Sequence, residues 1–367
     1  MILQDLLLYY LYLSNILCTV LPATTFKAFL SKPSRTYLRR NGGRLAAEGH
    51  SSHFVSDASS SFSREEIHPP VKASGPVDYL IFVVHGIGAT EENLAKYSES
   101  LKHTLEVTRR HSFKKVPCEF HLEMINWKRG LADEQAELIT PLIPPSRDDV
   151  KSSREWATGA AADILFYAGD KDRKHRLLKS VSNNINEAYH RLMSEDAEKY
   201  KNSKIALIGY SLGSMILYDV LNGNCLLDFK VSSFFLWGSP LSAYLALTQS
   251  PTSIEIPETL RGNYFNVFHP LDPLAFRQEP LVYGEAAQTP VVIPRWFTDQ
   301  ASIINATRAC PPRIDYVLKV FQVPKQLGST IVGIAMLSSH FAYWNNRDLA
   351  FFILARLTGF NPTEPPF

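Results

Sequence analysis

One short stretch, IALIGYSLGS, constrains the fold of this chain more than any other feature of the sequence. It places Ser211 in the spacing Gly209-x-Ser211-x-Gly213, after the apolar run Ile205–Ile208 and before the helical pattern Ser214–Leu221. Two glycines permit a tight, strained strand-to-helix turn, because a side chain at either position would collide with the neighbouring strand or helix. Such a turn lifts the serine oxygen above a sheet. The motif therefore predicts an α/β domain with Ser211 as a nucleophile, and a surface serine without a chemical role is the alternative.

The rest of the chain alternates apolar, β-rich runs with helical patterns, which is typical of a mainly parallel sheet flanked by helices. The run YLIFVV at Tyr79–Val84 ends at Gly86 and Gly88, as expected for a strand buried on both faces. Further strands are predicted at Phe120–Trp127, Ile205–Ile208, Val231–Leu236 and Tyr264–Phe268, helices at Glu91–Arg110, Leu177–Ala197 and Ser214–Leu221, and a helix or strand at Ala160–Tyr167. The predicted fold class is α/β, with an α/β-hydrolase-like sheet.

Two stretches fit this alternation poorly: Ser242–Glu258 and Leu281–Pro312, the second of which is rich in proline. Insertions of this kind commonly lie over the carboxyl ends of the strands, where ligands bind. We therefore expect lid-like insertions here, with ordinary surface loops as the alternative.

The amino terminus differs in composition from the rest of the chain. Residues 1–45 form an apolar and basic leader, in which the apolar stretch Leu6–Leu21 is followed by six basic residues before Glu48. The stretch is shorter than the roughly 20 residues that cross a bilayer comfortably, so a membrane anchor and an amphipathic leader both remain open. The basic flank favours a cytoplasmic body, peripheral to or anchored on an intracellular membrane. Residues 46–76 are predicted to be a Ser-rich linker, and 77–367 the folded domain.

Composition excludes one class of partner. Lys and Arg total 38 against 36 for Asp and Glu, and a net charge of +2 provides no general attraction to nucleic acid. The 45% of hydrophobic residues is sufficient for a full core. The four cysteines are widely separated and lack the paired spacing of metal sites.

A serine hydroxyl is a weak nucleophile and needs a histidine base and an acid, which in this fold follow in the order Ser, Asp or Glu, His. Asp272 stands in FHPLDPLAF, where a strand passes into a loop, and His340 stands later in SSHFAYW. Of the 11 histidines, His340 is the only one that follows Asp272. The sequence thus predicts Ser211, Asp272 and His340 as the catalytic residues.

The competitors for the acid role are Asp315 and Asp348. Asp315 lies in RIDYVLKV at a predicted strand start. We expect it instead to accept hydrogen bonds from nearby backbone or from Arg313.

The oxyanion of a tetrahedral intermediate needs two backbone donors. The amide of Leu212 is one candidate, because it follows the nucleophile at a helix amino terminus. The loop VVHGIGAT provides the other, with Ile87 as first choice and Gly88 as second. A plain glycine-rich turn is the alternative.

Laid side by side, these segments resemble the DDHD-domain family of intracellular phospholipases. The matching segments, from about Val77 to Leu357, are FVVHGIG, ADILFY, LIGYSLGSMILYDVL, FFLWGSPL, NVFHPLDPLAFRQEPL, RIDYVL and SSHFAYWNNRDLAFFIL. The four letters of the family name would fall on Asp272, Asp315, His340 and Asp348. Tyr210 departs from the pattern, because the family usually has histidine there.

The resemblance implies a phospholipase A1-type enzyme that removes a fatty acyl chain from glycerophospholipids, often phosphatidic acid, at a membrane surface and without a cofactor. Three aspartates and a histidine could also ligate a metal, but a metal on His340 would block its use as a base, so a metal remains open. Two alternatives remain: a lipase acting on di- or triacylglycerol, and a catalytically idle membrane-trafficking adaptor. We expect the chain to lack the interaction domains of larger family members and the apolar leader to substitute for them.

Overall fold

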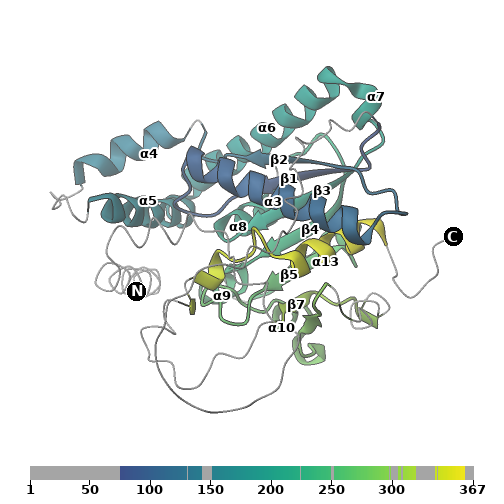
Figure 1. Ribbon diagram of the computed structural model, residues 1–367. Helices are drawn as coiled ribbons and strands as arrows, with labels where there is room; N and C mark the ends of the chain where they lie inside the picture. The colour runs from purple at the N-terminus through teal and green to yellow at the C-terminus, as the bar shows by residue number, and fades with distance from the viewer. Residues whose placement is uncertain are drawn as a thin grey trace, which may run out of the picture.

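The computed structural model describes residues 75–129, 131–142, 151–223, 225–248, 252–296, 298, 305–306, 309–319, 335–336 and 338–359 (Figure 1). The predicted leader, and the predicted linker up to residue 74, lie outside these residues. Val77, the predicted start of the folded domain, is buried and donates its backbone N–H to the carbonyl oxygen of Lys199 at 2.9 Å.

Seven strands of the described chain form one sheet in which every pair is parallel. They are β1 (Tyr79–Val84), β2 (Phe120–Ile125), β3 (Lys204–Tyr210), β4 (Val231–Trp237), β5 (Tyr264–Phe268), β6 (Val291–Ile293) and β7 (Asp315–Leu318), in the spatial order β2-β1-β3-β4-β5-β7-β6. A parallel sheet with this α/β order is an α/β-hydrolase-like fold, as the sequence predicts.

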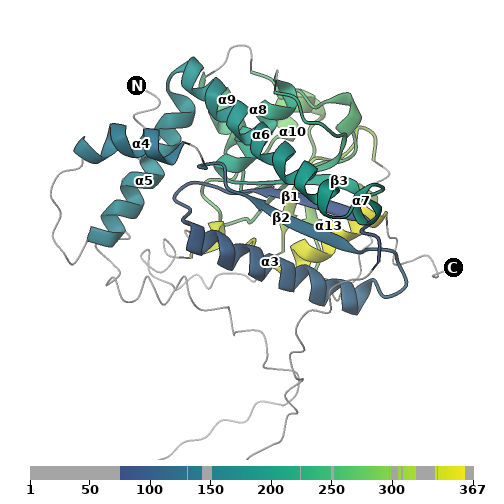
Figure 2. The same cartoon turned by 90° about the horizontal axis from the view of Figure 1, so that it is seen from above.

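Helices cover both faces of this sheet, as Figure 2 shows. The helical segments are α3 (Glu91–Ser112), α4 (Ala132–Ile139), η1 (Thr140–Leu142), α5 (Lys151–Ala168), α6 (Lys171–Glu195), α7 (Ala197–Tyr200), α8 (Leu212–Asn222), α9 (Leu241–Thr248), η2 (Glu258–Leu260), α10 (Glu279–Tyr283), η3 (Gly284–Ala286) and α13 (Arg347–Thr358). Helices α6 and α8 pack on one face, and α3 and α13 on the other.

Strand β1 shows how the sequence builds these two layers. Its side chains alternate between the faces: Leu80 and Phe82 join the core under α6 and α8, and Ile81 and Val83 join the core under α3 and α13. All six residues of β1 are buried, which explains why the run is continuously apolar.

The strand order places a topological switch point between β1 and β3. Within the sheet, β2 lies next to β1 on one side, and β3, the next strand in the sequence, lies next to β1 on the other side. The loops that follow β1 and β3 therefore diverge at the carboxyl edge, which is where ligands bind in sheets of this type. Helices α4 and α5 extend beyond this edge, at the left of Figures 1 and 2.

The structure corrects the predictions for two segments and decides a third that the sequence leaves open between helix and strand. The stretch Ser242–Glu258 begins within α9, whose Leu241 and Leu245 are buried in the core, so this part packs on the sheet. The stretch Leu281–Pro312 includes β6, which extends the sheet by pairing with β7. The ambiguous segment Ala160–Tyr167 belongs to α5.

Candidate active site

The loop between β3 and α8 has the conformation that its glycines predict. Ser211 has φ 53° and ψ −123°, and it is the one non-glycine residue with positive φ in the described chain. A Cβ on Gly209 would collide with the backbone of Ser214, and a Cβ on Gly213 would collide with the carbonyl oxygens at the end of β1. The strained turn therefore requires glycine on both sides of the serine.

Three side chains that are remote in the sequence form a hydrogen-bonded chain at the carboxyl edge. His340 Nε2 lies 3.0 Å from Ser211 Oγ, and His340 Nδ1 lies 3.0 and 2.9 Å from the two carboxylate oxygens of Asp272. All three residues are buried, with exposed fractions of 3% for Ser211, 7% for Asp272 and 5% for His340. The arrangement allows the imidazole to take a proton from the serine while the carboxylate orients the ring.

Asp272 has further donors that hold its charge. Tyr343 donates its hydroxyl to Oδ2 at 2.6 Å, and the amide of Leu274 donates to Oδ1 at 2.9 Å. Burial opposes the charge, but His340 together with these donors lowers the pKa of Asp272 below its usual value. Tyr343 was not among the residues predicted for the site. The feature of the sequence that could have identified it is its position three residues after His340.

The loop after β1 contains the two predicted amide donors Ile87 and Gly88. The structure does not favour Gly88, the second choice, as an oxyanion donor, because its N–H already donates to Asp163 Oδ2 at 2.8 Å. Within the described part of the chain, the amide of Ile87 donates no hydrogen bond. Leu212 begins α8, and the Ser211 side chain does not cap that helix, so the amides of Leu212 and Ile87 remain the candidate pair of oxyanion donors.

A small pocket adjoins this loop. It is lined by the segment 85–89, Asn93, Tyr97, Tyr210, Phe341 and Trp344. Tyr210, where the family usually has histidine, packs its ring 5.0 Å from that of His340 and contributes to the pocket wall. His85 is fully buried there, and burial lowers its pKa to about 4.

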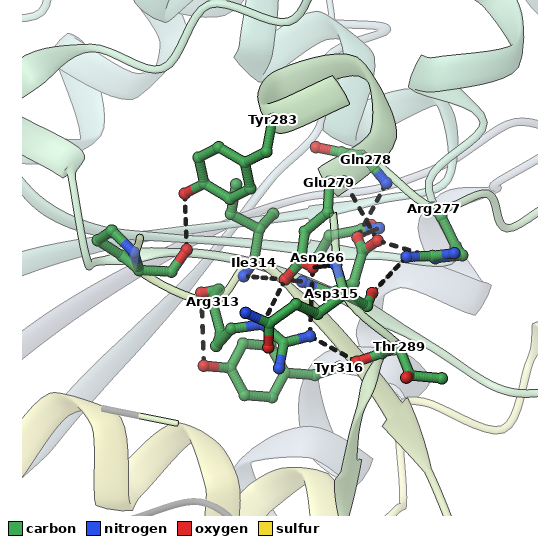
Figure 3. Close-up of polar contacts among 12 residues, drawn as sticks. Asn266, Arg277, Gln278, Glu279, Tyr283, Thr289, Arg313, Ile314, Asp315 and Tyr316 are labelled. Atoms are coloured by element: carbon green, nitrogen blue, oxygen red, sulfur yellow. Dashed lines mark hydrogen bonds and ion pairs between the residues drawn. The ribbon is translucent and has the colours of Figure 1, made fainter. Parts of the chain in front are cut away.

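Asp315 lies in a separate polar network on β7 (Figure 3). Its carboxylate accepts the side chain of Asn266 and the amides of Gln278 and Glu279, at 2.9 to 3.2 Å. Burial raises the pKa of Asp315. The backbone partners agree with the prediction, but the arginine does not: Arg277 lies 3.3 Å from Asp315.

Arg313, the arginine expected to pair with Asp315, instead pairs with Glu279 at 2.9 Å (Figure 3). The last residue of the family name, Asp348, pairs with Arg295 at 2.9 Å and accepts the amide of Trp296 at 2.8 Å. Burial raises the pKa of Asp348.

The four residues of the family name therefore do not converge. Asp272 and His340 touch, whereas Asp315 and Asp348 have other partners. Among the described residues, no group of three or more His, Cys, Asp or Glu side chains could hold a metal ion.

A parallel sheet with a Ser–His–Asp chain of hydrogen bonds at its carboxyl edge defines an α/β-hydrolase fold. Residues 227–302 match the family model described as DDHD domain. The chain carries a DDHD domain and is a distant homologue of the DDHD1 and intracellular phospholipase A1 family.

Phospholipase DDHD1 of Homo sapiens is 24% identical over 289 residues, which cover 60% of this chain and 31% of that protein. A mitochondrial "Probable phospholipase" of Saccharomyces cerevisiae is 28% identical over 250 residues, covering 58% of this chain and 34% of the relative. A cutinase-like protein from Cryptococcus sp. has a TM-score of 0.30 at 8% identity, covering 78% of this chain and 97% of that chain.

The chain spans about a third of the length of these two curated relatives, 31% and 34%. In the residues that the structure describes, none of the helices combines the length and apolar character needed to span a bilayer.

Proposed function

We propose that this protein is a serine-dependent lipid acyl hydrolase of the phospholipase A1 type, which releases a fatty acid from glycerophospholipids, with phosphatidic acid as a candidate substrate. The observation that carries the proposal is the chain of hydrogen bonds from Ser211 through His340 to Asp272. The phospholipases among the relatives support the lipid substrate.

In the first half of the reaction, Ser211 Oγ attacks the carbonyl carbon of the ester while its proton moves to His340 Nε2. The carbonyl oxygen becomes an oxyanion, which the amides of Leu212 and Ile87 stabilise. His340 then gives its proton to the leaving alcohol, a lysophospholipid, and the acyl group remains on Ser211.

In the second half, water attacks the acyl-enzyme. His340 takes a proton from this water and returns it to Ser211 as the fatty acid leaves. Asp272 stays ionised throughout and stabilises the imidazolium, which is consistent with its lowered pKa.

The lipid must leave a bilayer to reach Ser211, so the protein acts at the surface of an intracellular membrane. Residues 1–45, with an apolar stretch and six following basic residues, supply the attachment from the cytoplasmic side. Deletion of residues 1–45 is expected to weaken salt-sensitive binding to anionic vesicles and to leave hydrolysis of a short-chain soluble ester nearly unchanged. Equal loss of both activities would place the leader in the folded core.

A fluorophosphonate probe tests the nucleophile directly. Wild-type protein is expected to be labelled, and Ser211→Ala to be unlabelled and inactive while its circular dichroism spectrum is unchanged. Absence of labelling in the wild type would favour the idle adaptor. A panel of lipids with products identified by mass then separates the substrates: release of fatty acid from triacylglycerol but not from phosphatidic acid would identify a neutral-lipid lipase.

A further inference from the structure

One fully buried carboxylate near the site has no part in the reaction described above. Asp163, on α5, has an exposed fraction of 0%. Its Oδ2 accepts the amide of Gly88 at 2.8 Å and the ammonium of Lys128 at 2.7 Å, and its Oδ1 accepts the side chain of Gln135 at 2.9 Å. Burial raises its pKa, and Lys128 and the hydrogen bonds oppose that rise.

The loop that Asp163 contacts is the one between β1 and α3, and it is held at two points. At its start, Trp127 Nε1 donates to the carbonyl oxygen of His85 at 3.1 Å. Three residues later, Asp163 accepts the amide of Gly88. The partners come from the segment after β2 and from α5, so two separate parts of the chain fix a loop of a few residues.

The amide that Asp163 binds is one peptide away from the proposed oxyanion donor. The amides of Ile87 and Gly88 are separated only by the φ and ψ angles of Ile87, because each peptide unit is planar. Isoleucine is β-branched, and its backbone is further restricted. Fixing the Gly88 amide therefore restricts the direction of the Ile87 amide.

We propose that Asp163 is a positioning residue, which holds the Gly88 amide and thereby keeps the Ile87 amide aimed at the developing oxyanion. The inference rests on the proposed hydrolase function. Without an acceptor at this position, the Gly88 N–H would be unsatisfied in a buried setting, and the loop would rotate to recover a partner. The Ile87 donor would then lose its preorganised direction, on which oxyanion stabilisation depends.

Another carboxylate provides a matched control. Asp219, on α8, also pairs with a lysine, Lys174, at 2.7 Å, and it also accepts a neutral donor, the hydroxyl of Tyr167, at 2.5 Å. These two partners lie on α5 and α6 and not in the loop after β1. Asp219→Leu thus removes a lysine–carboxylate ion pair of the same length at a more exposed position, and it leaves the Gly88 amide bonded to Asp163.

The test compares four variants: Asp163→Leu, the double variant Asp163→Leu/Lys128→Met, Asp163→Asn and Asp219→Leu. Leucine has the same branching at Cγ as aspartate but accepts no hydrogen bond. The double variant also removes the lysine that would otherwise be unpaired, so it keeps the test available where the single leucine variant does not fold. Asparagine keeps one acceptor for Gly88, because Gln135 can turn its amide to accept the new NH₂ group.

The readouts are kcat and KM for a soluble short-chain ester, and the inhibition constant of a trifluoromethyl ketone that forms a tetrahedral adduct with serine. Both leucine variants at position 163 are expected to lose about 10²-fold in kcat, the effect of losing one oxyanion donor, with KM nearly unchanged. The inhibition constant should rise by a similar factor. Asp163→Asn should retain most of the activity, and Asp219→Leu should show wild-type kcat.

Three outcomes would overturn the inference. In the first, the folded leucine variants at position 163 have the same kcat as Asp219→Leu. Another is a loss of kcat without weaker binding of the ketone. The third is a loss in Asp163→Asn as large as in the leucine variants, which would mean that the charge is needed and not the acceptor. A wild-type protein without Ser211-dependent turnover would instead remove the proposed function itself.

Discussion

Tyr210 donates its hydroxyl to the backbone carbonyl of His340 at 2.7 Å. The residue before the proposed nucleophile thus holds the segment that carries the proposed base. The same ring packs against the imidazole and forms an edge contact with Trp344, with the centroids 5.1 Å apart. One side chain therefore couples the end of β3 to the segment before α13.

Tyr210→Phe tests this coupling. The ring and its packing remain, but the bond to His340 is lost, and a hydrogen bond of this kind contributes on the order of 1 kcal/mol. We expect kcat for a soluble ester to fall roughly fivefold, which corresponds to that energy, with KM nearly unchanged. Steady-state kinetics check this, and a kcat equal to that of the wild type would mean that His340 is held by other contacts.

Asp272→Asn is expected to lose about 10⁴ in kcat, as in a serine protease triad, because asparagine no longer stabilises the imidazolium or selects the correct tautomer. The protein should remain folded, since the amide occupies the same volume. Fluorophosphonate labelling rates measured beside kcat check the result. A loss below tenfold would assign the acid role to another residue.

Asp315→Asn is expected to act mainly on stability. Its carboxylate accepts several buried donors near β7, and an amide would leave one of them without an acceptor, at a cost of about 1–3 kcal/mol in the free energy of unfolding. Urea denaturation measures that cost, and ester hydrolysis at saturating substrate should be near wild type. A dead but normally stable variant would instead make Asp315 part of the chemistry.

His85 predicts how stability depends on pH. Its pKa falls from 6.5 to about 4 in the folded protein because it is buried, so the unfolded chain binds more protons between these values. The contribution of the neutral His85 side chain to the free energy of unfolding is present above pH 6.5 and is lost as the pH falls toward 4. We expect the free energy of unfolding to drop by about 2 kcal/mol from pH 7 to pH 5 on this account.

Urea denaturation at several pH values, for the wild type and His85→Gln, isolates that contribution. Glutamine does not titrate, so the variant should show a shallower slope over this range, even though its overall stability is lower. Parallel slopes for the two proteins would show that folding does not lower the pKa of His85.

The elements with continuous apolar runs were predictable from the sequence. Tyr79–Val84 and Tyr264–Phe268 are strands with the predicted bounds, because strands buried on both faces are largely apolar. Asn266 is the exception within β5, and its side chain donates to Asp315 and to the carbonyl oxygen of Phe276. The segment RDLAFFIL was not predicted to be a helix, although it forms most of α13. It is buried on nearly all sides, and a helix without a polar face loses the periodicity that would identify it.

Residues of the candidate site were predictable where the proposed chemistry requires a particular residue type at a particular place in the sequence order. The serine motif requires a later acid and histidine, and these requirements led to Asp272 and His340, which the structure brings together. Asp163 had no such signal. Its position depends on a contact between α5 and a loop 75 residues earlier, and no local pattern encodes a pairing at that separation.

The hydrogen-bonded chain at the carboxyl edge spans long separations: 129 residues from Ser211 to His340 and 68 from Asp272 to His340. Of these three residues, the DDHD match at 227–302 contains only Asp272. Loops of this length close slowly during folding, so the site is completed only after strands from both halves of the sheet have docked. Under the proposed function, fluorophosphonate labelling after dilution from urea therefore reports the last step of folding. We expect labelling to recover later than the helical circular dichroism signal.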